Sequence, residues 1–186
     1  MNYRRIIAAF LAAACLSFAA CDDKKAEGEA TTQAGGTAAE QGDTAEGTFS
    51  DLHKVVDNVK GFYGENVEFI FTEDEYSDEV LMFTYGLMED KFVEAVESYV
   101  LTECDGMSAD TFAIITFKDG TDKALIEEAA SVMEAEYVEG LKSKLAAYNP
   151  EEFAASDGYK LKIYDDSVMM VISSEHTNDI LTAVGK

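Results

Sequence analysis

The sequence predicts an α+β fold over residues 49–186, a two-layer domain in which a mostly antiparallel four-stranded sheet carries helices on one face. Three observations lead to this prediction. Residues 112–117 form a short apolar run typical of a strand, residues 122–148 repeat apolar side chains at helical spacing, and two further runs near the C-terminus read as a hairpin. The resulting β-β-α-β-β-α order, behind helical lead-in segments, is typical of a sheet covered by helices.

The lead-in segments begin at Ser50, after which apolar residues at helical spacing predict a helix that ends at Gly64. These residues are Leu52, Val55, Val56, Val59 and Phe62. The alternation in residues 67–71 allows a short strand. Residues 78–86 predict a short helix with Gly86 as its C-terminal cap.

Residues 92–104 are ambiguous, because their apolar positions fit one face of a helix and one face of a strand. We favour a strand, since the residues at 98–102 have side chains that suit a sheet. Asp105-Gly106 then supplies a turn before the strand at 112–117.

A long helix is predicted at about 122–148. Asp119-Gly120-Thr121-Asp122 marks its start, with Thr121 or Asp119 as the N-cap, and Asn149-Pro150 marks its end. Such a helix is about 40 Å long, whereas four strands at about 4.8 Å spacing are under roughly 20 Å wide. The helix must therefore overhang the sheet or bend near Gly140.

Two elements complete the domain. Residues 159–164 and 168–172 form the predicted hairpin across Asp165-Asp166. A final helix at about 177–184 follows, with Ser173 or Ser174 as its cap.

The N-terminus has the pattern of a signal peptide over residues 1–20. Arg4 and Arg5 precede an apolar run at 6–20, which is shorter than the roughly 20 residues of a transmembrane helix. The run ends in Leu16-Ser17-Phe18-Ala19-Ala20-Cys21, which is similar to the lipidation box of a bacterial lipoprotein. We expect a diacylglyceryl group on Cys21, whose two acyl chains give a stable anchor. The alternative is ordinary cleavage near Ala20 without a lipid.

Lipidation would place the protein at the extracytoplasmic face of the bacterial cell membrane. Residues 22–48 contain no aromatic or large aliphatic side chain, so we expect a disordered acidic tether. With 27 residues, its root-mean-square span is about 30 Å.

The net charge of −23 limits the partners. Residues 49–186 contain 10 lysines and 30 acidic residues, and both arginines lie in the signal peptide. The chain beyond that peptide therefore lacks guanidinium groups for bidentate phosphate binding, and nucleic acid is excluded as a partner. The charge favours cations or a basic surface protein or peptide, unless it serves only to solvate the surface.

No cofactor is expected, although one acidic tract is a weak calcium candidate because calcium prefers several oxygen ligands. Its carboxylates are Glu73, Asp74, Glu75, Asp78 and Glu79. The tract lacks EF-hand spacing, and a solvated loop is the alternative. Cys104 has no intramolecular partner once Cys21 is lipidated, and we expect it to be a small buried hydrophobe.

No catalytic motif appears. His53 and His176 are expected at the surface, and zinc-ligand spacing, phosphate loops and a nucleophile elbow are all missing from the sequence. We therefore expect a non-enzymatic binding or accessory domain. The alternatives are a small solute-binding lipoprotein of a transporter and, less favoured, a hydrolase that uses His53 or His176.

Several short tracts resemble a family of bacterial lipoproteins known as domain of unknown function 4358, over about residues 75–186. They are Tyr85-Gly86, Met107-Ser108-Ala109-Asp110, Ala113-Ile114-Ile115 and Lys118-Asp119, followed by the long acidic helix and the hairpin that ends at Ser173. The resemblance implies a tethered surface domain. It implies no catalytic residue.

Overall fold

The computed structural model describes residues 40–41, 49–103, 108–156 and 158–185. All of these residues belong to one compact unit, Gly36–Lys186. Cys21 and Cys104 lie outside the described residues, as do the signal peptide and most of residues 22–48.

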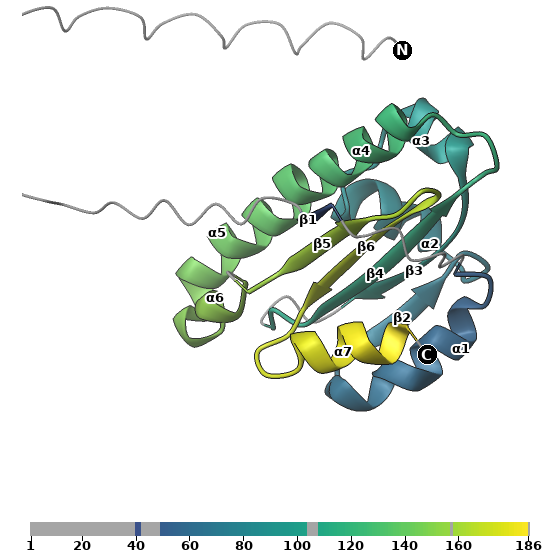
Figure 1. The fold of residues 1–186 in the computed structure, drawn as a ribbon. Helices are drawn as coiled ribbons and strands as arrows, with labels where there is room; N and C mark the ends of the chain where they lie inside the picture. Colours follow the sequence, from purple (N-terminus) through teal and green to yellow (C-terminus); the bar gives the residue numbers. More distant parts are fainter. Residues whose placement is uncertain (1–39, 42–48, 104–107, 157, 186) are drawn as a thin grey trace, which may run out of the picture. The chain divides into compact units, whose positions relative to one another are not determined.

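A single sheet with the strand order β1-β5-β6-β4-β3-β2 forms the centre of this unit (Figure 1). Its strands are β1 (Glu40–Gln41), β2 (Glu68–Phe71), β3 (Val96–Glu103), β4 (Thr111–Phe117), β5 (Lys160–Ile163) and β6 (Ser167–Ile172). All neighbouring strands from β5 to β2 are antiparallel, whereas β1 pairs parallel with β5. The α+β fold is thus confirmed, with β2 as a fifth antiparallel strand beside the four that were expected.

Helical segments connect the strands. They are α1 (Leu52–Val59), η1 (Lys60–Phe62), α2 (Ser77–Glu79), η2 (Val80–Thr84), α3 (Asp90–Ala95), α4 (Lys123–Val132), η3 (Met133–Val138), α5 (Glu139–Tyr148), α6 (Pro150–Ser156) and α7 (Thr177–Val184). The strand expected over 92–104 begins only at Val96, because Phe92 belongs to α3. Among the described residues, no helix combines the length and apolarity needed to cross a membrane.

Helices cover both faces of the sheet, so the prediction of helices on one face was wrong. One core joins the long helix to Leu101, Ile115 and Met170, and the other joins α1 and α7 to Ile114 and Val171. Figure 1 shows α4 and α5 on one side of the sheet and α1 and α7 on the other. The physical reason is that every residue of β4 and β6 is buried, and side chains that alternate between two faces need cover on both.

The segments α4, η3 and α5 form the predicted long helix, which has 26 residues and packs on the sheet. Its N-cap is Asp122, whose Oδ1 accepts a hydrogen bond from the Ala124 N–H at 3.0 Å, rather than the expected Asp119 or Thr121. The helix ends at Tyr148, and Pro150 starts the short α6, a first-turn position that suits proline.

The middle of this helix, η3, is a π-helix. Along the whole long helix, apolar residues recur every four positions, at Leu125, Ala129, Met133, Tyr137, Leu141 and Leu145. An α-helix turns about 100° per residue, so side chains four apart drift by about 40° around the axis. The wider π turn offsets part of this drift, and it keeps Tyr137 and Leu141 buried against the sheet.

The two cores can be tested with neighbouring residues of β4. Ile114 and Ile115 are both fully buried, on opposite faces. Replacing either with alanine is expected to lower the free energy of unfolding by about 2–5 kcal/mol, because each leaves a cavity. Urea denaturation would measure both losses, with the part-exposed Val93→Ala as the control. A near-zero loss for either isoleucine variant would contradict the two-core fold.

Candidate functional site

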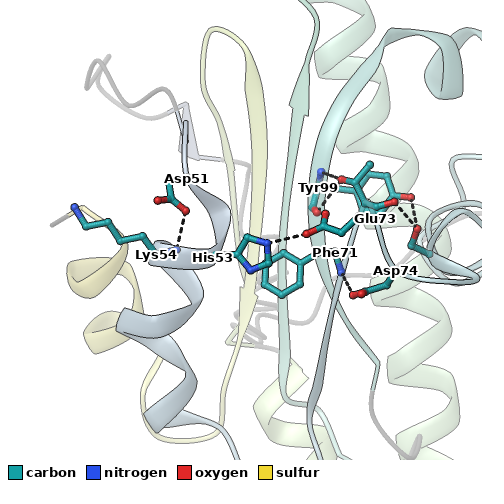
Figure 2. Close-up of polar contacts among 9 residues, drawn as sticks. Asp51, His53, Lys54, Phe71, Glu73, Asp74 and Tyr99 are labelled. Atoms are coloured by element: carbon teal, nitrogen blue, oxygen red, sulfur yellow. Dashed lines mark hydrogen bonds and ion pairs between the residues drawn. The ribbon is translucent and has the colours of Figure 1, made fainter.

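The carboxylates of the acidic tract have separate partners (Figure 2). Asp74 Oδ2 accepts a hydrogen bond from the Phe71 N–H at 2.7 Å, and Glu73 Oε1 lies 2.7 Å from His53 Nε2. Asp78 Oδ1 accepts from the Tyr99 hydroxyl at 2.7 Å. Burial is the main cause that raises the pKa of Tyr99 to about 12, so this hydroxyl keeps its proton at neutral pH.

The calcium candidates are therefore not brought together as one ligand set. Glu75 and Glu79 are exposed side chains on the same tract. Within the described parts of the chain, no group of three or more Asp, Glu, His or Cys side chains is placed to hold a metal ion. The tract instead organises the turn between β2 and α2.

The two histidines are far apart in the sequence, and each lies beside a carboxylate. The His53 ring stacks on Phe71 with 3.9 Å between ring centroids, at 21°. His176 Nδ1 is 3.5 Å from Asp179 Oδ2 at the start of α7. Their side chains are 64% and 43% exposed, as predicted for surface residues.

The two π-helical segments, η2 and η3, meet at a pair of tyrosines. The rings of Tyr85 and Tyr137 are stacked with 4.5 Å between centroids and are nearly parallel. The Tyr85 hydroxyl donates to the Thr102 carbonyl at 3.1 Å, and the Tyr137 hydroxyl lies 2.8 Å from Thr111 Oγ1. Both rings are buried, so these contacts attach η2 and η3 to β3 and β4.

Gly86 allows this approach for two reasons. Its φ of +82° lies in the left-handed region that favours glycine. A Cβ atom at this position would lie 2.7 Å from Glu136 Cβ and 3.3 Å from Val132 Cγ1. The Tyr85-Gly86 tract therefore lets the chain after η2 pack directly on η3.

A groove of about 350 Å³ lies beside this contact, and we call it the π groove. Its lining comes from η2, the end of β3 and the long helix: Phe83, Thr84, Glu103, Glu136, Tyr137, Gly140, Leu141 and Lys144. Short π-helical segments frequently occur at functional sites. The groove was not predicted from the sequence, although the four-residue spacing of the long helix was a signal for the π turn.

Three charged side chains of the π groove have no charged or hydrogen-bonding partner among the described residues. Glu103, Glu136 and Lys144 are exposed, and none has a hydrogen bond or ion pair within the described part of the chain. Elsewhere lysines do pair, as Lys91 does with Glu128 at 2.7 Å. As far as the structure describes the chain, the groove thus offers two carboxylates and one ammonium group to a ligand.

A second hollow, of about 440 Å³, lies between α6 and the start of α7. Ser173 lines it, and Asp110 lies nearby because Thr111 of β4 pairs with Ile172 of β6. Burial and then the Glu152 carboxylate raise the pKa of Asp110, against the opposing effect of a hydrogen bond from the Ser174 backbone. The described part of one tract noted in the sequence, residues 108–110, thus lies with Ser173 at one end of the sheet.

Comparison with known proteins gives one match. The sequence model of the family described as "Domain of unknown function (DUF4358)" matches residues 65–173, more than half of the chain, and the resemblance noted in the sequence is confirmed. No curated protein and no solved structure matches the chain. The matched range runs from just before β2 to just after β6, so it contains both π segments and Asp110.

Gly86→Ala is expected to lower the free energy of unfolding by about 2–4 kcal/mol, from left-handed strain and overpacking together. The matched control is Gly120→Ala. Gly120 has a φ of +83°, but no atom lies within 4 Å of the place that a Cβ would occupy. The free energy of unfolding of Gly120→Ala should therefore fall by only about 1–2 kcal/mol, from backbone strain alone. Urea denaturation compares the two variants, and equal losses would show that Gly86 is not required for the contact with η3.

Asp110→Asn should change the pH dependence of stability. The folded-state pKa of Asp110 is raised above its ordinary value of about 3.8. Ionisation of this carboxyl therefore lowers the free energy of unfolding of the wild type as pH rises from about 3.8 through the raised pKa. The asparagine variant lacks this cost and keeps an acceptor for the Ser174 N–H. Its stability relative to the wild type should therefore be higher at pH 7 than at pH 3.5, measured by urea denaturation at both values. The same difference at both pH values would contradict the raised pKa.

Proposed function

For this chain, which belongs to the DUF4358 family, we propose the function of a non-enzymatic binding or accessory domain. A lipid on Cys21 would hold it at the extracytoplasmic face of the bacterial cell membrane. The observation that carries the proposal is the N-terminal pattern, in which Arg4 and Arg5, the apolar run at 6–20 and the tract ending at Cys21 follow in order. Two acyl chains on one thiol provide a stable anchor without a membrane-spanning helix.

The short strand β1 (Glu40–Gln41) lies within residues 22–48, the predicted tether. Between Cys21 and β1 there are 18 residues, 22–39. As a disordered tether, this segment would span about 23 Å, which is comparable to the size of a domain with a radius of gyration of about 14 Å. Since β1 pairs with β5, the tether would join the domain at that edge of the sheet.

The charge of the domain supports a basic partner. Residues 49–186 have a net charge of −20 and no arginine. A field of this sign attracts basic proteins or peptides and repels nucleic acid and anionic lipid head groups. The partner would therefore be a basic molecule at the cell surface, and contact with the membrane would depend on the acyl chains.

Cross-linking on intact cells tests the binding role. The anchored protein is expected to capture a specific surface protein or peptide, which mass spectrometry would identify. The opposite result is a failure to capture any partner, together with turnover of a substrate that is lost in His53→Ala or His176→Ala. That result would replace the binding role with a hydrolase.

Cys21→Ser tests the anchor. The variant should appear in the medium or remain as an uncleaved precursor, because serine cannot accept the thioether-linked lipid. Cell fractionation and incorporation of labelled palmitate measure the change. Cys15→Ser is the matched control, since Cys15 lies inside the apolar run and should be dispensable. Correct cleavage of Cys21→Ser with unchanged membrane retention would contradict lipidation.

A further inference from the structure

We propose that the π groove binds a basic peptide segment of the partner, with an apolar side chain on Phe83 and basic groups at Glu103 and Glu136. This inference rests on the proposed binding function and names the site and the chemistry of its ligand. Three features of the described residues support it: an exposed apolar surface, unpaired charges and a rigid frame.

Two exposed aromatic side chains, Phe83 and Tyr148, supply apolar surface at or beside the groove. Phe83 lines it and is 70% exposed. Tyr148 is 72% exposed and lies one helical turn beyond Lys144, on the same side of α5. A partner that covers these side chains gains free energy, because apolar surface is removed from water.

The charges select the class of partner. Glu103 and Glu136 face the groove without a cation in the described structure, so lysine or arginine side chains of a ligand can form charge-assisted hydrogen bonds with them. Lys144 lies at the α5 side of the groove, where its ammonium group can donate to a carbonyl or carboxylate oxygen of the same peptide. The net charge of −20 adds long-range attraction for a basic segment.

The frame of the groove is set before any ligand binds. The stacked Tyr85 and Tyr137 rings attach both π segments to the sheet, and Gly86 leaves room for their close approach. A groove that does not have to form on binding loses less conformational entropy. The open, mixed apolar and charged lining suits an extended peptide that alternates basic and apolar side chains.

The test uses the full-length protein purified from membranes in detergent. The probe is the fluorescein-labelled peptide Gly-Gly-Lys-Phe-Lys-Gly-Gly, and the control probe has glutamate in place of both lysines. Fluorescence anisotropy should detect binding of the lysine peptide and none of the glutamate peptide. Phe83→Ala and Glu136→Gln should each weaken binding by about tenfold, because the first removes an apolar contact surface and the second removes a charge-assisted hydrogen bond.

Matched variants outside the groove are Tyr76→Ala for the exposed aromatic ring and Glu97→Gln for the exposed carboxylate. Both should bind the lysine peptide as the wild type does, and thermal unfolding should show that all four variants are folded. No binding, or equal weakening by variants inside and outside the groove, would overturn the inference. Since membrane anchoring and partner capture are measured separately, they would still decide the proposed function.

Discussion

The fold depends on strands that are apolar on both faces. In β4 and β6 every residue is buried, so the two central strands cannot leave either face of the sheet in water. The long helix covers one face and α1 and α7 cover the other. Once both faces are covered, binding within the described part of this unit is left to the ends of the strands and the outer helix surfaces. The π groove and the hollow near Asp110 both lie at such places.

The π turn in the long helix connects packing with the proposed binding site. A strict α-helix would rotate the four-residue repeat of apolar side chains away from the sheet. The π segment corrects the rotation and keeps Tyr137 stacked on Tyr85. The same turn presents Glu136 beside Gly86 and toward the groove. The π turn thus keeps Tyr137 in the core on one side of the helix and places the Glu136 carboxylate at the groove on the other side.

The sequence predicted those elements whose signal is local. Turn residues at Asp165-Asp166 and capping near Asp122 locate the hairpin and the long helix to within a few residues. The second helical layer was missed because an apolar run such as Ile114-Ile115 does not indicate whether helices cover one face of the sheet or both. The π groove was missed because it depends on contacts between segments about 50 residues apart, Tyr85 with Tyr137, that no local pattern records.

Anchoring and binding are assigned to separate parts of the chain. The residues of the π groove, from Phe83 to Lys144, fall inside the family range 65–173, whereas Cys21 and the proposed tether precede it. The helices α1 and α7 also lie outside that range, although they complete the second core. The family segment therefore contains the whole candidate binding surface but needs flanking helices to bury its sheet. In this arrangement the N-terminal anchor would determine where the protein acts, and the groove on the opposite layer from α1 and α7 would determine what it binds.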